Sequence, residues 1–180
     1  MRCTYCDTEY AFSGGSNMEV TSILSQVEAY GTKYVTVTGG EPLAQKECNV
    51  LLTALCDAGY SVSLETGGAM DIAAVDTRVS VILDIKTPGS NEEKNMLWEN
   101  LAHIKTRDEI KFVLCSREDY DWAKQKILEL NLAEKCSILF SPSYHELNPA
   151  ELARWVLADK LPVRMQMQLH KILWGEKAGV

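Results

Sequence analysis

Apolar positions along the chain repeat with two periods, and this alternation predicts helices and strands in turn. Apolar residues spaced i, i+3, i+4 and i+7 are typical of a helix, whereas short apolar runs and period-two alternation are typical of strands. The predicted helices lie at residues 20–30, 48–58, 92–102, 118–130 and from 149 onward, and the predicted strands lie at 34–38, 60–65, 79–86, 110–115, 136–140 and 162–170.

Local signals at helix ends support several of these boundaries. Ser16 and Glu19 resemble a capping box ahead of the first helix. Asn148 is expected to cap the last predicted helix, with Pro149 in its first turn. The charged run at residues 92–94 is interpreted as a solvated helix start.

Repeated strand–helix units predict a parallel sheet with helices outside, either an open doubly wound sheet or a partial barrel. In both architectures ligands bind at the carboxyl ends of the strands. Three consecutive strands end in unusual residues, which are Gly39-Gly40-Glu41-Pro42, Glu65-Thr66-Gly67-Gly68, and Asp84 with Lys86. The sequence therefore predicts one shared site at this edge of the sheet.

Two polar patterns each allow two interpretations. Asp84 and Lys86 share one strand face, so they either form an ion pair or place a cation at the strand end to receive a carboxylate. In the last predicted strand, apolar residues alternate with Arg164, Gln166, Gln168 and His170. This polar set faces either solvent, as in an edge strand, or the interior of a barrel.

Composition limits the class of protein. The chain has 180 residues, of which 46% are hydrophobic and 24% charged, which suits one globular domain with a real core. A net charge of −7 argues against a broad nucleic-acid-binding surface. No apolar run approaches the roughly 18 residues of a membrane span, and the first residues do not resemble a signal peptide. We therefore expect a cytoplasmic protein without membrane or nucleic-acid partners.

The six cysteines divide into two groups. Four fall at apolar helix or strand positions and are interpreted as structural residues: Cys48, Cys56, Cys115 and Cys136. Cys3 and Cys6 form a Cys-x-x-Cys pair, which can hold half of a zinc site, act as a redox dithiol or supply two ligands to an iron–sulfur cluster. The chain has no second such pair, its three histidines are scattered, and a loop-like run follows Cys6. These features favour the cluster.

Four segments carry a resemblance to a known family. They are Arg2-Cys3-Thr4-Tyr5-Cys6-Asp7-Thr8 with residues 10–15, Thr38-Gly39-Gly40-Glu41-Pro42, residues 83–88, and Gln166-Met167-Gln168-Leu169-His170-Lys171. On these segments the chain resembles the radical S-adenosylmethionine (SAM) superfamily and, within it, the 7-carboxy-7-deazaguanine synthases. The resemblance implies a partial (β/α)6-type radical SAM barrel with a mostly parallel sheet, as a single core domain over residues 1–180.

One part of the family pattern is not found in the chain. The family's cluster motif is Cys-x-x-x-Cys-x-x-Cys, and its first cysteine would lie four residues before Cys3, upstream of Met1. We therefore expect the family's first strand and first cluster cysteine to be absent from these residues. Three thiolates hold three irons of a [4Fe–4S] cluster, whereas Cys3 and Cys6 provide two.

The resemblance implies a radical SAM lyase of queuosine and deazapurine biosynthesis. SAM bound at the open iron of a reduced [4Fe–4S] cluster would be cleaved to methionine and a 5′-deoxyadenosyl radical. The radical would take a hydrogen atom from 6-carboxy-5,6,7,8-tetrahydropterin, which rearranges to 7-carboxy-7-deazaguanine and loses ammonia. Two alternatives remain open, namely another small radical SAM enzyme such as a glycyl-radical activase, and a relative that has lost the cluster and its catalysis.

The resemblance also implies a role for individual residues. The cluster ligands would be Cys3 and Cys6, and Thr8 would help to hold Mg²⁺ through its hydroxyl. The SAM contacts would come from Tyr5, Cys6, Asp7, Gly39, Gly40, Glu41, Asp84, Ile85 and Lys86. The pterin contacts would come from Thr38, His170 and Val180. The family further implies a homodimer and an electron donor such as flavodoxin or ferredoxin.

Overall fold

The computed structural model describes residues 1–6, 8–9, 14–175 and 177. Its centre is a six-stranded sheet in the order β1-β2-β3-β4-β5-β6, in which each described pair of neighbours is parallel. The strands are β1 Tyr34–Val37, β2 Ser61–Thr66, β3 Ser80–Ile85, β4 Glu109–Leu114, β5 Ser137–Pro142 and β6 Arg164–Met165. No pairing joins β6 to β1 among the described residues, so the sheet is an open, partial barrel.

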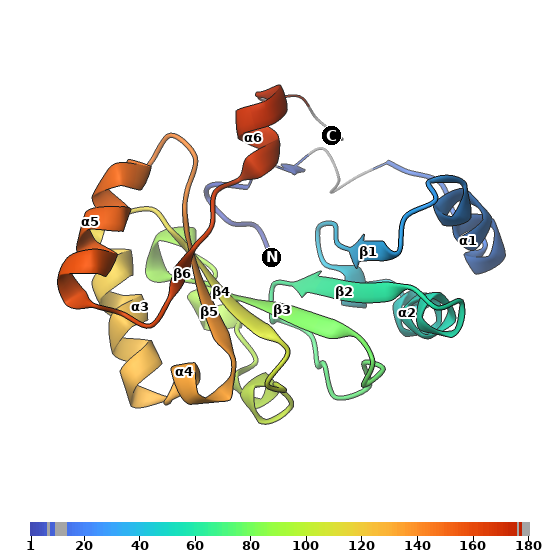
Figure 1. Ribbon diagram of the computed structural model, residues 1–180, viewed down its shortest axis with the longest axis horizontal. Coiled ribbons are helices and arrows are strands. Elements are labelled where there is room, and N and C mark those ends of the chain that lie inside the picture. The colour runs from blue at the N-terminus through green and yellow to red at the C-terminus, as the bar shows by residue number, and fades with distance from the viewer. Residues whose placement is uncertain (7, 10–13, 176, 178–180) are drawn as a thin grey trace.

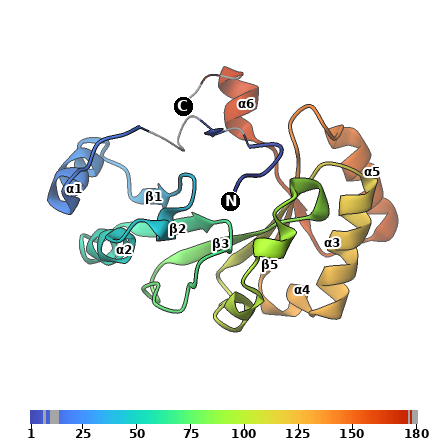
Figure 2. The same cartoon turned by 180° about the vertical axis from the view of Figure 1, so that it is seen from behind.

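Helices flank this sheet at both ends (Figures 1 and 2). They are α1 Val20–Ala29, α2 Cys48–Asp57, α3 Arg117–Glu129, α4 Leu132–Lys135, α5 Pro149–Asp159 and α6 Leu169–Trp174, with short 3₁₀ helices at Pro42–Ala44, Pro88–Ser90, Glu93–Asn95 and Trp98–Ala102. Helices α1 and α2 lie beside β1 and β2, and α3, α4 and α5 lie at the β6 end. The amino-terminal segment and α6 lie together over the other side of the sheet.

The core lies between the sheet and its outer helices. In β2 and β3 every second residue is buried, and the parallel register sets Leu64 beside Val81 and Leu83 beside Ile110. Phe112 on β4 contacts Phe140 on β5 edge to face, with ring centroids 5.7 Å apart. This alternation leaves the opposite face of the strands free for polar residues, which become the wall of the site described below.

Most of the predicted elements are confirmed. The first five strands and three of the helices begin and end within two residues of the predicted positions, and α5 begins at Pro149 as predicted. Asn148 caps α5 as expected, because its side-chain oxygen accepts a hydrogen bond from Ala150 N at 2.9 Å. The described residues contain no helix that is both long and apolar enough to cross a bilayer.

The predicted strand at residues 162–170 is wrong in its second half. Strand β6 ends at Met165, and α6 begins at Leu169, so His170 lies on a helix. Val163 and Met165 pack on the core, whereas Leu169 is 61% exposed. The alternation of apolar and polar residues in the sequence therefore continues beyond the residues that pair in the sheet.

Two helix predictions also need correction. The predicted capping box is absent, because α1 begins at Val20 and Glu19 itself is the N-cap, without a side-chain hydrogen bond. The predicted helix at 92–102 is instead two 3₁₀ helices interrupted by extended backbone at Met96. Leu97 N donates there to Gly68 O at 2.9 Å, so a tertiary contact takes the place of a helical one.

Candidate functional site

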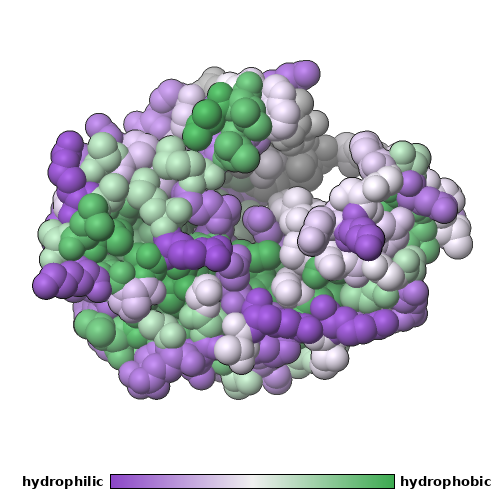
Figure 3. All heavy atoms as spheres, viewed as in Figure 1, coloured by the Kyte–Doolittle hydropathy of each residue, from purple (hydrophilic) through white to green (hydrophobic). Residues whose placement is uncertain are grey.

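A cavity of about 650 Å³ opens at the carboxyl ends of the strands. In Figure 3 the surface is hollowed between α6 and the β1 end of the molecule. All six strands end at this cavity, and the amino-terminal segment and the residues after β6 complete its wall. Its lining residues are Met1, Cys3, Tyr5, Cys6, Thr8, Thr38, Gly39, Gly40, Glu65, Thr66, Gly67, Asp84, Lys86, Lys111, Val113, Ser141, Ser143, Gln166–Lys171 and Lys177.

Glycines let the backbone of two strand ends approach the cavity. Gly39 has a φ of 150°, a conformation that side chains with a Cβ rarely adopt. A Cβ at Gly67 would lie 2.8 Å from Met1 Sδ and 3.4 Å from Glu41 Oε2. The Met1 side chain therefore lies against the backbone after β2, in space that a side chain at residue 67 would occupy.

Glu41 joins two neighbouring strand ends. Its carboxylate accepts hydrogen bonds from Thr66 Oγ1 at 2.9 Å, from Gly67 N at 2.9 Å and from Leu43 N at 3.1 Å. The loop after β1 is thereby fixed to the loop after β2. Since these donors belong to the chain itself, Glu41 holds the glycine-rich loop and does not line the cavity.

Lys86 and Asp84 form a nearly buried ion pair on the cavity wall. Lys86 Nζ lies 2.8 Å from Asp84 Oδ2, and the two side chains are 10% and 17% exposed. Burial is the largest single influence and opposes the charged ammonium, but the charge and hydrogen bond of Asp84, together with the nearby thiols, outweigh it, and the pKa of Lys86 is raised. The ion pair considered from sequence is confirmed, and the pair also faces the cavity.

One polar atom of this pair and one beside it have no hydrogen-bond partner within the described chain. They are Asp84 Oδ1 and the Tyr5 hydroxyl, both of them buried. Burial, and then the Asp84 charge, raise the pKa of Tyr5 far above its usual range, so the phenol stays neutral. Buried polar atoms in native proteins are nearly always satisfied, so a polar ligand in the cavity is the natural partner of both.

The cysteine segment forms the part of the wall next to this pair. Cys6 N donates to Cys3 O at 3.2 Å in a turn, and Cys6 Sγ lies 3.6 Å from Thr8 Oγ1. Both thiols are free and half-buried. Burial raises the pKa of Cys3, while the nearby Lys86 charge acts in the opposite direction. Burial and the neighbouring negative charges thus outweigh the ammonium, whereas a bound metal would favour the thiolate.

These donors fit two corners of an iron–sulfur cluster. The thiols of Cys3 and Cys6 are the correct ligand type and lie on the cavity wall. Within the part of the chain that the structure describes, no group of three or more His, Cys, Asp or Glu side chains could hold a metal ion. The described residues therefore supply two thiolates and not a third ligand.

Most residues singled out from the sequence come together at the cavity, but two do not line it. Cys3, Tyr5, Cys6, Thr8, Thr38, Gly39, Gly40, Asp84, Lys86 and His170 all line it. Ile85 is fully buried in the core, and Glu41 acts behind the wall. Asp7 and Val180 lie outside the described residues. Cys48 and Cys136 are buried as expected, whereas Cys56 and Cys115 are only half-buried.

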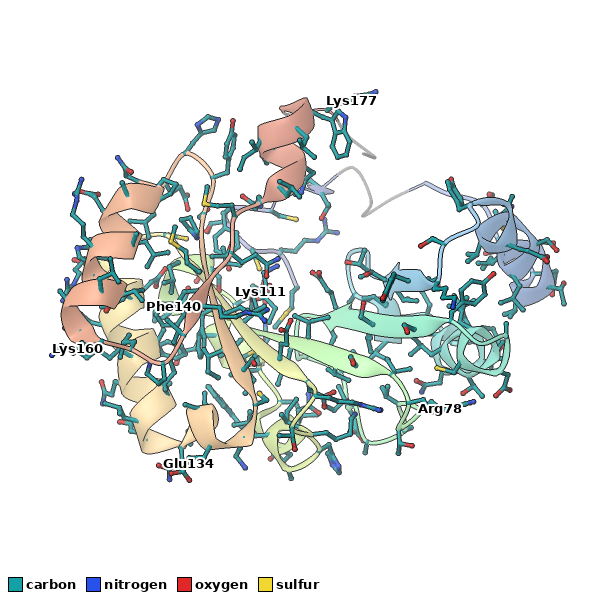
Figure 4. All side chains as sticks on the ribbon, in the orientation of Figure 1. Arg78, Lys111, Glu134, Phe140, Lys160 and Lys177 are labelled. Carbon is teal, nitrogen blue, oxygen red and sulfur yellow. The ribbon has the colours of Figure 1, made fainter. Side chains whose placement is uncertain are left out.

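Several lining residues were missed by the sequence analysis, most clearly Lys111. It points from β4 toward the open side of the sheet (Figure 4), and its Nζ lies 3.6 Å from Glu65 Oε2 on β2. A lysine between Ile110 and Phe112, inside a strand of a parallel sheet, was the available signal, because such strands are otherwise apolar. Ser141 near the end of β5 and Ser143 directly after it line the cavity in the same way.

Comparison with known proteins agrees with this geometry. A profile described as "Radical SAM superfamily" matches residues 1–88. The chain is 45% identical over 179 residues to 7-carboxy-7-deazaguanine synthase of Chlorobaculum tepidum, covering 98% of this chain and 81% of that protein. It is 37% identical over 196 residues to the protein of the same name from Koribacter versatilis, covering 100% of this chain and 87% of that protein.

Solved structures show the same fold at low identity. A crystal structure of Streptococcus suis SuiB bound to S-adenosylmethionine aligns with a TM-score of 0.64 and 14% sequence identity. The alignment covers 93% of this chain and 47% of that one, so the chain spans about half the length of that protein. The likeness therefore concerns the α/β core alone.

The open parallel sheet, the Cys-x-x-Cys segment and the glycine-rich strand end thus define a radical SAM enzyme, a class that uses SAM and a [4Fe–4S] cluster. Within this class, the 45% sequence identity to the Chlorobaculum tepidum protein over nearly the whole chain indicates the particular family. The chain belongs to the 7-carboxy-7-deazaguanine synthase family. The glycyl-radical activase considered from sequence is not favoured, because the similar curated proteins carry the synthase name.

Proposed function

We propose that the protein converts 6-carboxy-5,6,7,8-tetrahydropterin to 7-carboxy-7-deazaguanine with loss of ammonia, in queuosine and deazapurine biosynthesis. The observation that carries this proposal is the 45% identity to a synthase of that name over 98% of the chain. The cavity at the strand ends supports it, since about 650 Å³ lies in the range of small-molecule sites.

The cavity wall suits ligands that carry both a carboxylate and an ammonium group. Lys86, Lys111 and Lys171 bring ammonium groups to a chain whose net charge is −7. Asp84 Oδ1 offers a buried acceptor without a partner in the described chain. Methionine-type ligands such as SAM carry one group of each kind, and the pterin substrate adds a second carboxylate. Local charge complementarity of this kind orients ligands inside a cavity.

We assign the SAM contacts to Tyr5, Cys6, Asp7, Gly39, Gly40, Glu41, Asp84, Ile85 and Lys86. Gly39 and Gly40 admit the ligand close to the backbone, and Ile85 contributes main-chain atoms only, because its side chain is in the core. Glu41 acts indirectly through the bonds that fix the glycine loop. The exclusion of water by the apolar part of the wall strengthens each of these polar contacts.

Cys3 and Cys6 are the proposed cluster ligands of the described chain. When bound, the cluster supplies the electron that initiates reductive cleavage of SAM. The chain's own residues hold the thiolates at the wall, and Lys86 provides a positive charge near both thiols. Thr8, whose hydroxyl lies 3.6 Å from Cys6 Sγ, is the proposed oxygen ligand for Mg²⁺.

Thr38, His170 and Val180 are the proposed pterin contacts. Thr38 directly follows β1, and His170 lies in the first turn of α6. Both line the cavity, one at the β1 end of the sheet and one after β6. The substrate would thus be held between the glycine-rich loop and α6. We further propose that the protein is cytoplasmic, takes its electron from flavodoxin or ferredoxin, and acts without nucleic-acid or membrane partners.

A homodimer is also proposed, and one surface supports it. Four large apolar side chains of α6 are more than half exposed: Leu169, Ile172, Leu173 and Trp174. They contribute to the apolar patch that Figure 3 shows over α6. Exposed apolar patches of this kind are typical of interfaces. Light scattering coupled to size-exclusion chromatography tests the proposal, and a mass of one chain would contradict it.

The proposed reaction is tested by anaerobic reconstitution with iron and sulfide, followed by addition of SAM, reductant, Mg²⁺ and 6-carboxytetrahydropterin. We expect 7-carboxy-7-deazaguanine and ammonia in equal amounts by mass spectrometry and enzymatic ammonia assay. The Cys6→Ala variant should form neither product, whereas Cys56→Ala, which removes a thiol remote from the cavity, should keep wild-type turnover. Cleavage of SAM without product from the pterin would contradict the proposed substrate.

A further inference from the structure

Glu92 does not lie where the sequence suggested. Instead of a solvated helix start, it is 8% exposed, and its carboxylate faces the amino-terminal segment. Oε1 accepts a hydrogen bond from Arg2 N at 2.7 Å, and Oε2 accepts one from Asn95 Nδ2. The amide of the residue directly before Cys3 is therefore bound to a buried carboxylate 90 positions away in sequence.

The residues just before Glu92 bind the other side of Cys3. Thr4 N donates to Ser90 O at 3.2 Å, and Thr4 Oγ1 donates to Gly89 O at 2.8 Å. Together with the Arg2 contact, these bonds bracket Cys3 on both sides. Cys6 follows through its own bond to Cys3 O at 3.2 Å, so the position of both thiols depends on one short segment, residues 89–92.

Segment 89–92 is itself fixed to the core. Ser90 Oγ donates to Thr87 O at 2.6 Å and accepts from Glu92 N at 3.1 Å. Gly89 N donates to Asp119 Oδ1 at 2.8 Å, and the other oxygen of this nearly buried carboxylate accepts from Cys115 N at 3.0 Å. The segment thus connects the ends of β3 and β4 and the first turn of α3 to the cysteine segment.

We propose that Glu92 is a positioning residue that holds the Cys3–Cys6 pair against the cavity, an inference that rests on the proposed role of these thiols as cluster ligands. A carboxylate is a strong acceptor for a backbone N–H, and burial strengthens the bond further. Cluster ligands have to be held in a fixed geometry by groups behind them. Glu92 does this through the main chain, without touching either sulfur.

Thiol accessibility in the cluster-free protein tests the proposal directly. Under anaerobic, reducing conditions, N-ethylmaleimide pulses with peptide mapping measure the alkylation rate of each cysteine. In Glu92→Ala we expect Cys3 and Cys6 to react about tenfold faster, as the loss of one hydrogen bond allows, with Cys48 and Cys136 unchanged. Glu92→Gln should show a smaller rise, because its amide oxygen still accepts from Arg2 N.

Glu93→Gln is the matched control, because it makes the same change of charge one residue away. It should leave every alkylation rate unchanged. Equal rates at Cys3 in wild type and Glu92→Ala would overturn the proposal. A parallel rise at Cys48 and Cys136 would overturn it as well, since that would show a general loss of structure.

A second readout is the iron bound per chain after anaerobic reconstitution, with the visible absorbance of the cluster. Glu92→Ala should bind less iron than wild type, with Glu92→Gln between them and Glu93→Gln equal to wild type. Failure of wild type to bind iron or convert the pterin would count against the proposed function alone. The alkylation rates would still decide whether Glu92 positions the two thiols.

Discussion

At the scale of single residues, the cavity wall is held in place by a few charged side chains. The hydrogen-bond partners of these side chains belong to the chain itself. Glu41 is the clearest case, since three donors of the chain surround its carboxylate. The resemblance implied a SAM contact for this residue. In the folded chain its carboxylate is instead bound by donors of the chain itself, because the loop after β2 brings Gly67 N within 2.9 Å.

The Lys86–Asp84 pair leads to the first prediction at this scale. Lys86→Met leaves the Asp84 carboxylate nearly buried without its cation, so the free energy of unfolding should fall by about 3 kcal/mol. SAM binding, followed by calorimetry, should weaken as well. The double variant Asp84→Asn with Lys86→Met should recover stability but not binding.

The control for this prediction is Lys94→Met, which removes an exposed lysine outside the cavity. It should change neither the unfolding free energy nor SAM binding. Wild-type SAM affinity in Lys86→Met would contradict a role for the ammonium group at the ligand.

A second residue-scale prediction concerns a buried amide. Asn100 is fully buried, accepts from Ile72 N at 3.1 Å and donates to Met70 O at 2.9 Å. Asn100→Ala leaves these groups without partners, and the unfolding free energy in urea should drop by about 2–3 kcal/mol. Asn17→Ala, at an exposed position, should have no effect. An equal stability for both variants would contradict the structural role of Asn100.

At the scale of elements, the polar contact between α3 and α5 predicts a pH dependence. Tyr120 OH donates to Asp159 Oδ2 at 2.8 Å, and Lys124 Nζ lies 2.8 Å from the same oxygen. The Lys124 contact, and then the Tyr120 bond, lower the pKa of Asp159. A lowered pKa stabilises the fold above the unfolded value of about 3.9, and this contribution is lost as pH falls further.

Urea unfolding at pH 5 and pH 3 tests this prediction. The wild-type protein should lose more stability between these values than Asp159→Asn, which has no carboxylate to protonate. Glu134→Gln on α4, an exposed position in Figure 4, should keep the wild-type difference. A wild-type loss no larger than that of Asp159→Asn would contradict the proposed contact.

The elements also show which sequence signals hold in the folded chain. Strands β2 to β5 were predictable because each carries apolar positions that lie in the buried core. Strand β1 was predictable from its alternation, although none of its residues is buried. The strand at 162–170 was not, since alternation persists where only Arg164 and Met165 are paired. Glu92 was also misjudged, because its partner, Arg2 N, is distant in sequence and adds no local pattern.

At the scale of the whole molecule, the location of the site was more predictable than the other residues that complete its wall. Parallel strands bring their carboxyl ends to one edge, so the motifs after β1, β2 and β3 had to meet. Lys111, Ser141 and Ser143 come from β4 and β5, which end without a distinctive motif, and only the folded sheet adds them to the wall. The sequence motifs thus indicate the chemistry of the site. The further residues that complete its wall are recognised only in the tertiary structure.

The central claim is that a SAM-derived radical and the pterin meet in the same cavity, at the strand ends. Transfer of deuterium tests it most directly, using 6-carboxytetrahydropterin deuterated at its carbon-bound positions and the reconstituted protein. The conversion with loss of ammonia is redox-neutral, so the hydrogen atom that the radical takes has to be returned to the substrate-derived radical. We therefore predict deuterium, by mass spectrometry, at the 5′ carbon of recovered SAM and of 5′-deoxyadenosine, formed together with 7-carboxy-7-deazaguanine. Unlabelled 5′-deoxyadenosine alongside unchanged pterin would contradict the account.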